Sequence, residues 1–136
     1  TGCKPEDWLT QDRSAAGKVV ANLVHLMATV TPGAKLGSTA PYDYAALMLA
    51  EAGERQPRTL ANAFLDPVRL DAPDLMGRTA AALAGYVGDV DAMYGPGEER
   101  WLACRLPGLD VPGAARATLP ELTVALSQAV TAAGRS

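Results

Sequence analysis

The sequence predicts an α+β fold that is rich in helix and has an incomplete sheet. Three observations support this prediction. Apolar residues recur at helical spacing in three long segments, two shorter apolar segments have the length of strands, and Pro and Gly separate most of these segments. Two strands alone form a marginal sheet whose edges remain open, so we expect further strands from outside the chain to complete it.

The first predicted helix covers residues 14–30, with Ser14 as its candidate N-cap and Pro32 as the residue that ends it. The residues at apolar helical spacing are Val20, Leu23, Val24 and Met27. Another face is polar and consists of Lys18, Asn22, His25 and Thr29. The apolar run at 44–51 has strand length and is predicted as a strand, although its alanines leave a helical turn open.

A short helix is predicted to follow Pro57 and to end before Pro67. Its predicted packed side consists of Leu60, Ala61, Phe64 and Leu65. A longer helix begins near Asp71, its candidate cap, and is stopped by the turn residues at 95–97. Its predicted packed face consists of Leu75, Thr79, Leu83, Tyr86, Val87, Val90 and Tyr94.

The last third of the chain contains a strand, a loop and a helix. Residues 100–106 alternate, with Leu102 and Cys104 on one side, which indicates a half-buried strand. Residues 107–117 are rich in Pro and Gly and are predicted as a loop. Thr118 and Glu121 have the spacing of a capping box, which predicts that the last amphipathic helix begins there.

Composition limits the function classes. The chain has 136 residues, a length typical of a single domain or part of one. Its formal charge of -3 gives no support to a nucleic-acid surface spread over the whole chain. Any such surface must be local. No apolar run reaches the roughly 20 residues that a membrane span needs. With no secretory segment at the start of the sequence, we expect reduced thiols and a cytoplasmic location.

No residue pattern predicts catalysis. His25, the only histidine, lies on the polar helix face and is interpreted as solvated. Cys104 is interpreted as a small buried hydrophobic residue, and neither cysteine has metal-ligand spacing. Asp71 and Asp74 are interpreted as acidic residues that stabilise the start of a helix. Asp89 and Asp91 lie two residues apart and would point to different faces of a helix, so neither pair is interpreted as a metal site. We therefore expect a protein that is not an enzyme and that needs no cofactor and no metal.

One stretch, residues 31–42, has residues suited to an anion. Successive amides in a glycine-bearing bend can form an anion-binding nest, and a cation with hydroxyl groups lies in the same stretch. The candidate contacts with phosphate or ribose are Gly33, Ala34, Lys35, Gly37, Ser38 and Thr39. The alternative interpretation is that these glycines only permit a crossover connection.

The same region carries a family resemblance. The order V-H-hydrophobic-x-A-T, P-G-A-K, S-T-A-P, an apolar strand, A-N-A-F and P-V, from about residue 19 to 68, resembles the C-terminal part of the CasC family. That family is the backbone subunit of the type I-E CRISPR surveillance complex called Cascade. Beyond Val68 the likeness is only in the order of helix, strand, loop and helix.

The resemblance implies the C-terminal part of an RRM-like (ferredoxin-like) palm, as a fragment without the family's N-terminal portion. Residues 1–136 would then form one domain fragment. Residues 1–13 would be a flexible tail, 14–68 the palm helix, loop, strand and short helix, and 69–136 the C-terminal helices and strand.

The resemblance also implies a function. The chain would hold the backbone of CRISPR guide RNA and leave the bases free to pair with target DNA. Its partners would be the guide RNA, copies of the same subunit, other Cascade subunits and, indirectly, target DNA. No association with a membrane is expected. Asn62 would either brace the 31–42 bend or contact RNA itself. The alternative function is a protein–protein module that docks by an exposed strand edge, without direct RNA contact.

Overall fold

The computed structural model describes residues 13–30, 44–69, 71 and 73–133 of the chain. In chain order the elements are α2 (Arg13–Thr29), β1 (Leu47–Ala52), the 3₁₀ helix η2 (Ala61–Phe64), α3 (Leu75–Tyr94), β2 (Glu99–Cys104), β3 (Ala114–Arg116) and α4 (Leu119–Ala132). The predicted α+β class is confirmed. No helix in these ranges is long and apolar enough to cross a membrane.

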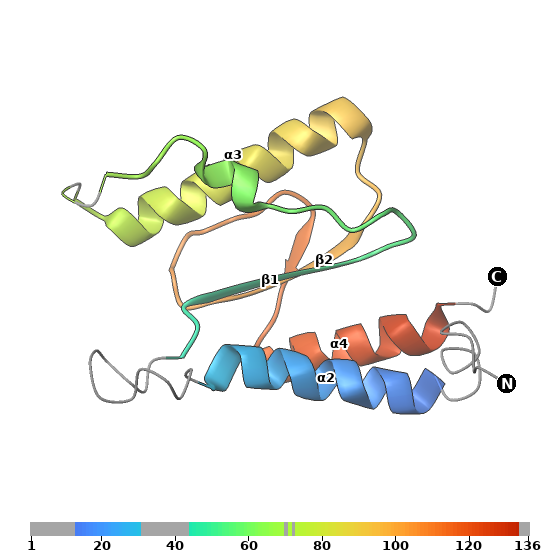
Figure 1. Cartoon of the computed structure of the whole chain (residues 1–136). Coiled ribbons are helices and arrows are strands. Elements are labelled where there is room, and N and C mark those ends of the chain that lie inside the picture. Colours follow the sequence, from blue (N-terminus) through green and yellow to red (C-terminus); the bar gives the residue numbers. More distant parts are fainter. Residues whose placement is uncertain (1–12, 31–43, 70, 72, 134–136) are drawn as a thin grey trace, which may run out of the picture.

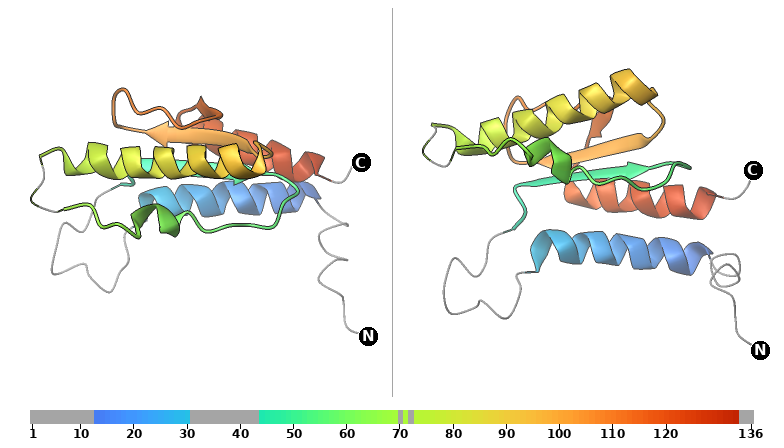
Figure 2. Two further views of the ribbon diagram at one scale, coloured as in Figure 1. Left: turned by 90° about the horizontal axis from the view of Figure 1, so that it is seen from above. Right: turned by 45° about the horizontal axis from the view of Figure 1, so that its top comes forward.

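The elements lie in three layers, with the sheet in the middle. The helix α3 covers one face of the sheet, and α2 and α4 lie side by side along the other face (Figure 1). Of these two helices, α4 lies under the strands, whereas α2 lies farther out, beyond β1 (Figure 2). The position of α2 leaves one of its sides without a covering element among the described residues.

The described sheet has the strand order β1-β2-β3. β1 runs antiparallel to β2, with Leu47 opposite Cys104 and Ala52 opposite Glu99. β3 runs parallel to β2 and falls inside the stretch predicted as a loop, so that prediction was wrong at residues 114–116. A strand of three residues is too short to show alternation in the sequence. Its pairing depends on the adjacent β2 instead.

The core lies between α3 and the sheet. Leu83 and Val87 of α3 pack with Leu102 of β2 and with Val111. Val87 and Leu102 are 0% and 2% exposed, as the helical and alternating patterns predict. This contact fixes how α3 lies over the strands.

The predicted helix after Pro57 is reduced to the single turn of η2. Leu60 and Ala63 pack against the core, whereas Phe64 is 40% and Leu65 81% exposed. The prediction that Phe64 and Leu65 belong to the packed side was wrong. One 3₁₀ turn brings residues three apart onto the same side, so the i, i+4 face of an α-helix does not form.

The helix ends follow the sequence signals in most places. The predicted capping box is confirmed, because the Thr118 N–H donates to Glu121 Oε2 at 2.7 Å and the Glu121 N–H donates to Thr118 Oγ1 at 3.4 Å. α3 ends at Gly95 as predicted. The N-cap of α3 is Asp74 and not Asp71, which was wrong; the Gly77 N–H donates to Asp74 Oδ1 at 3.1 Å.

The helix α2 packs on only part of the predicted face, with Val20 and Val24 half-buried. Gly17 and Ala28 are buried, while Leu23 and Met27 are 53% and 73% exposed. A β-carbon on Gly17 would lie 2.8 Å from the Ser127 carbonyl oxygen of α4. Gly17 therefore allows the two helices to approach closely, and Leu23 and Met27 remain exposed.

Candidate functional site

Six of the seven predicted RNA-contacting residues cannot be placed. Gly33, Ala34, Lys35, Gly37, Ser38 and Thr39 lie outside the described residues. The two elements that flank this stretch, α2 and β1, are described, and the Ala45 N–H donates to the Ala28 C=O at 2.9 Å. This bond joins the two flanks directly, so Ala45 lies beside the C-terminal end of α2.

Asn62, the seventh predicted residue, lies on η2 and is exposed. Its backbone carbonyl accepts a hydrogen bond from the Leu65 N–H at 3.3 Å. Its side chain makes no hydrogen bond with the described residues, so nothing there shows the predicted bracing role. The amide is free to bind a ligand.

Asn62 lines a groove between the segment 62–69 and α3. The groove has a volume of about 610 Å³. Its lining residues are Asn62, Ala63, Leu65, Asp66, Pro67, Val68, Arg69, Arg78, Ala82, Gly85, Tyr86 and Asp89. It is large enough for a nucleotide-sized group, because small-molecule sites usually have volumes of about 300–1,000 Å³.

The charges of this groove balance. Arg69 pairs with Asp71, with its Nη2 2.7 Å from Asp71 Oδ2, and this arginine holds the pKa of the aspartate below its usual range. Arg78 makes no ion pair with any described residue, while Asp66 and Asp89 add two carboxylates. Arg78 is therefore the cation of the groove that a phosphate could reach, and the carboxylates oppose a strongly anionic ligand.

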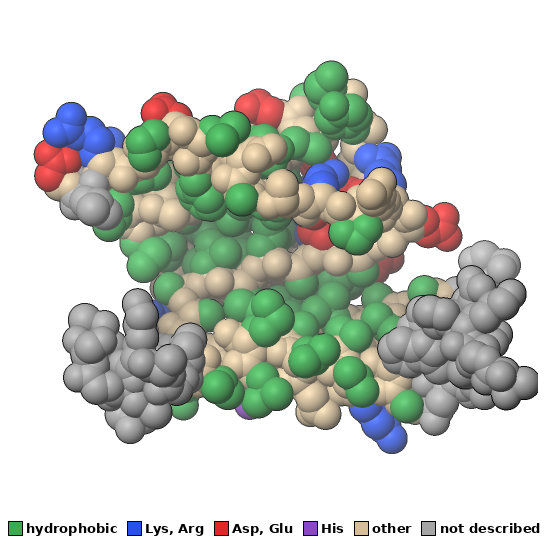
Figure 3. Space-filling model, in the orientation of Figure 1, with side chains coloured by type: hydrophobic (Ala, Val, Ile, Leu, Met, Phe, Trp, Pro, Cys, Tyr) green, Lys and Arg blue, Asp and Glu red, His purple; other side chains and the backbone are tan. Residues whose placement is uncertain are grey.

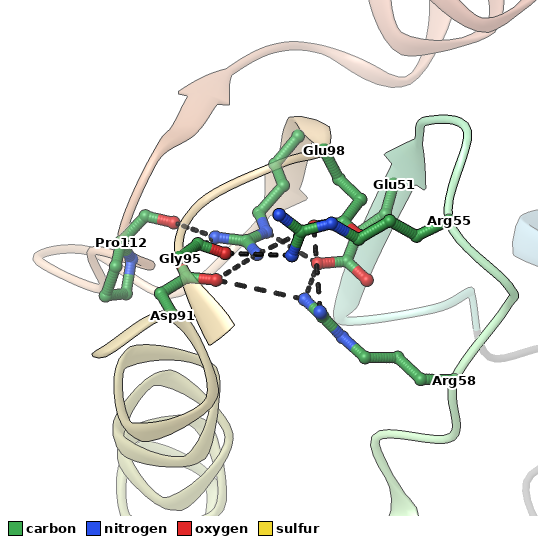
Figure 4. Close-up of polar contacts among 8 residues, drawn as sticks. Glu51, Arg55, Arg58, Asp91, Gly95, Glu98 and Pro112 are labelled. Atoms are coloured by element: carbon green, nitrogen blue, oxygen red, sulfur yellow. Dashed lines mark hydrogen bonds and ion pairs between the residues drawn. The ribbon is translucent and has the colours of Figure 1, made fainter. Parts of the chain in front are cut away.

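A second polar cluster, which the sequence patterns did not predict, centres on Arg100 (Figure 4). This side chain of β2 is 1% exposed. Its Nε donates to Glu51 Oε1 at 2.5 Å, its Nη2 donates to Asp91 Oδ1 at 2.6 Å, and its Nη1 donates to Asp91 Oδ2. The Nη1 also donates to the Pro112 carbonyl at 3.0 Å. One guanidinium thus connects β1, α3 and the loop before β3.

The charges in the Arg100 cluster compensate one another. Arg58 Nη2 lies 3.0 Å from Glu51 Oε1, and Glu98 Oε2 lies 3.6 Å from both Arg58 Nη1 and Arg100 Nη2. The hydrogen bonds from Arg100 hold the pKa of Asp91 below its usual range. The same bonds raise the pKa of Arg100 further above its ordinary value. Both groups therefore remain charged at neutral pH.

The cluster also engages Arg55 and Arg58, two cations of the segment between β1 and η2. Arg55 Nη1 donates to the Gly95 carbonyl at 2.9 Å, and Arg58 pairs with Glu51. A β-carbon on Gly97 would collide with the Arg55 guanidinium, which covers this glycine closely. These contacts hold the loop that leads into η2. The two arginines therefore have a structural role.

Other candidates for chemistry remain isolated. His25 is exposed on α2, and Cys104 is a half-buried free thiol whose Sγ accepts a hydrogen bond from the Leu106 N–H at 3.2 Å. Within the part of the chain that the structure describes, no group of three or more His, Cys, Asp and Glu could hold a metal ion.

One sequence signal did point to Arg100. In an alternating strand, residue 100 shares a face with Leu102 and Cys104, which predicts that its side chain faces inward. A buried arginine requires acidic partners. Those partners, Glu51 and Asp91, lie 49 and 9 residues away in the sequence, and no local pattern identifies them.

Comparison with known protein families gives a match over most of the chain. The family described as CT1975-like protein matches residues 6–131, which include the predicted RNA-contacting stretch, the Asn62 groove and the Arg100 cluster. No curated protein matches the chain.

Proposed function

The chain belongs to the CT1975-like family, a family of CRISPR-associated proteins, and on this premise we propose that it holds guide RNA as a backbone subunit of a Cascade-type complex. Family membership is the observation that carries the proposal, since it covers nearly the whole chain. The proposed partners are guide RNA, further copies of the chain and other Cascade subunits, in the cytoplasm. Target DNA would be reached only through base pairing with the guide.

The proposed contacts are made to the sugar-phosphate backbone. Lys35 neutralises a phosphate, Ser38 and Thr39 donate to phosphate or ribose oxygens, and the amides at Gly33 and Gly37 allow close approach. Asn62 and Arg78 of the groove add an amide and a guanidinium that can donate to the same strand. Such contacts recognise the backbone and leave the base edges free.

We also propose that the chain has no catalytic activity. His25 and Cys104, the side chains most suited to nucleophilic catalysis, lie on different elements, α2 and β2. Nucleophilic catalysis requires a nucleophile and a base within hydrogen-bond reach of each other. The function that we propose for the described residues is therefore binding.

The test uses the complete natural protein, purified with the RNA that it retains. We expect Lys35→Glu to lower the retained RNA, measured as the ratio of absorbance at 260 and 280 nm, while the thermal midpoint stays nearly unchanged. Increasing salt should release RNA from the parent protein steeply, since phosphate contacts displace counterions. Fewer contacts in the variant should make its salt dependence shallower.

Lys18→Glu is the matched control. Lys18 is exposed on α2 and forms no ion pair with described residues. The substitution therefore makes the same change of charge at a position outside the predicted RNA contacts. RNA retention that is equal in the parent and in Lys35→Glu would contradict the assignment of Lys35. Retention that barely depends on salt would favour the alternative, a docking module without RNA contact.

A further inference from the structure

One face of α3 forms a wall of the Asn62 groove, the groove between the segment 62–69 and α3. The residues of α3 that line it have the spacing i, i+4, i+7, i+8 and i+11, which belongs to a single helix face. They are Arg78, Ala82, Gly85, Tyr86 and Asp89. Arg78 and Asp89 stand at the two ends of this face, about 16 Å apart along the helix axis. In the space-filling view, basic side chains lie together where α3 begins, and further acidic side chains lie along the helix (Figure 3).

The middle of this face is open space. A β-carbon on Gly85 would meet nothing within 4 Å. Ala82, the other small residue of the face, lies nearly one turn before it. Small residues let a ligand approach the backbone closely. A flat group can therefore lie against α3 between the two charged ends.

Tyr86 supplies an aromatic wall beside this space. On the helix it lies between the groove face and the buried residues Leu83 and Val87, and its side chain is half-buried. Residues three apart are neighbours on a helix surface, so Asp89 lies next to Tyr86 on the exposed side. An aromatic ring at the border of the core is a platform on which an unstacked base can lie.

The polar side chains of the groove do not serve the fold. Asn62, Asp66, Arg78 and Asp89 are all exposed, and none of these side chains makes a hydrogen bond or ion pair with a described residue. The Arg100 cluster is the opposite case, because its guanidinium and carboxylates bond one another. The groove therefore brings together an aromatic ring, an amide, a guanidinium and carboxylates that a ligand can use.

The carboxylates limit which part of an RNA strand can enter the groove. A carboxylate only accepts hydrogen bonds, and it repels a phosphate. Guanine is the base whose Watson–Crick edge presents two adjacent N–H donors, at N1 and N2, which match the two oxygens of a carboxylate. Uracil presents one donor between two acceptors, and adenine and cytosine each present a donor beside an acceptor. A carboxylate next to a stacking platform therefore favours guanine.

We propose that the Asn62 groove holds one unpaired guanine nucleotide of the guide RNA. The base stacks on Tyr86 over the open space at Gly85, and its N1–H and N2–H groups donate to Asp89. Arg78 and the Asn62 amide donate to phosphate and sugar oxygens of the same stretch of strand. This inference rests on the proposed RNA-holding function and deepens it, since this one nucleotide is recognised by its base.

The test uses the complete natural protein, freed of retained RNA in high salt, with GMP, AMP, CMP and UMP as separate ligands. Saturation-transfer NMR titrations measure the dissociation constant of each mononucleotide. We expect GMP to bind at least about fivefold more tightly than the other three, because guanine alone forms the bidentate pair.

Two substitutions of the same kind identify the carboxylate. Asp89→Asn should abolish the preference for GMP and leave the binding of UMP unchanged within about twofold. Asp66→Asn makes the same chemical change on the other wall of the groove and should keep the preference. Both residues are exposed, so both variants should melt at nearly the midpoint of the parent.

Two further variants test the position of the base. Gly85→Leu fills the open space and should weaken the binding of every mononucleotide at least about tenfold. Its thermal midpoint should not fall, since the β-carbon meets nothing and leucine favours the helix. Ala81→Leu is the matched control, because Ala81 is exposed on α3 and does not line the groove. It should leave binding unchanged.

The other outcomes overturn the proposal. Equal binding of the four mononucleotides, a GMP preference that survives Asp89→Asn, or binding that survives Gly85→Leu would each refute the guanine site. A trilysine peptide that binds more tightly than GMP, and that Asp89→Asn weakens, would assign the groove to a protein segment. Lys35-dependent retention of RNA together with equal binding of the mononucleotides would refute the guanine site alone and leave the proposed function standing. A GMP preference in a protein that retains no RNA would refute the proposed function instead.

Discussion

Arg100 shows how much one buried side chain determines in this protein. Its guanidinium is 1% exposed and bonds Glu51, Asp91 and the Pro112 carbonyl. Removing one partner from such a pair leaves an uncompensated charge in a poorly solvated place, which costs more than the pair contributes. The cluster therefore makes the joint between β1, β2 and α3 sensitive to single changes.

Asp91→Asn should lower the free energy of unfolding by about 3 kcal/mol, because Arg100 loses the carboxylate that accepts its bidentate hydrogen bonds. Urea denaturation at pH 7 measures this change. Asp89→Asn is the matched control, since Asp89 is exposed on the same helix and should change the free energy by less than about 0.5 kcal/mol. Equal effects of the two substitutions would mean that the pairing with Arg100 contributes nothing.

The same aspartate predicts a dependence on pH. The pKa of Asp91 is lower in the folded state than the roughly 3.9 of an unfolded chain. A carboxyl group with a lowered pKa stabilises the fold above its unfolded pKa, and this stabilisation is lost as the pH falls through the folded value. The stability difference between the parent and Asp91→Asn should be constant from pH 7 to about 5 and should shrink below about 4. A difference that stays constant down to pH 3 would contradict this.

At the scale of elements, the contact between α2 and α4 depends on small residues. Gly17 is buried there, and a β-carbon would lie 2.8 Å from Ser127 Oγ and from Thr131 Oγ1 as well as from the Ser127 carbonyl oxygen. Glycine has a low helix propensity, but this position of α2 has no room for a side chain. Tight packing of the helix pair sets the position of α2, and that position leaves Leu23 and Met27 exposed.

Two glycine-to-alanine substitutions should have opposite effects. Gly17→Ala should destabilise the protein by about 1–3 kcal/mol, since the added methyl group forces α2 and α4 apart. Gly85→Ala on α3 should stabilise it by about 0.5–1 kcal/mol, because its β-carbon meets nothing within 4 Å and alanine favours the helix. Thermal melting of both variants decides, and a stabilising Gly17→Ala would refute the close helix contact.

At the scale of the whole molecule, most described arginines serve the fold. Arg100, Arg58 and Arg55 belong to the cluster, Arg69 pairs with Asp71, and Arg116 donates to the Leu106 carbonyl at 2.8 Å. The formal charge of the chain is also negative, at -3. Neither feature favours a broad surface for a polyanion.

We therefore expect the 136 residues alone to bind single-stranded RNA weakly, with a dissociation constant above about 10 μM at physiological salt and a shallow salt dependence. Fluorescence anisotropy with a labelled oligoribonucleotide measures both quantities. Nanomolar binding would show that these residues contain a complete RNA site and that the loop and groove contacts suffice by themselves.

Much of the local structure follows from the sequence by itself. The capping box at Thr118, the end of α3 at Gly95 and the alternation of β2 each depend on residues a few positions apart, and such signals reflect backbone hydrogen bonds formed locally. For the candidate site, the sequence supplied Asn62 and the resemblance that led to guide RNA. It did not supply the groove, because Arg78 and Tyr86 come from a different element.

Tertiary structure decided what depends on distant neighbours. The three-residue β3, the acidic partners of Arg100 and the face by which α2 packs all require residues that are far apart in the chain. Leu23 and Met27 look like core residues in the sequence, yet Gly17 makes the close contact with α4, because backbone approach and not hydrophobicity alone sets the spacing of two helices. The Asn62 groove is likewise a property of the assembled elements.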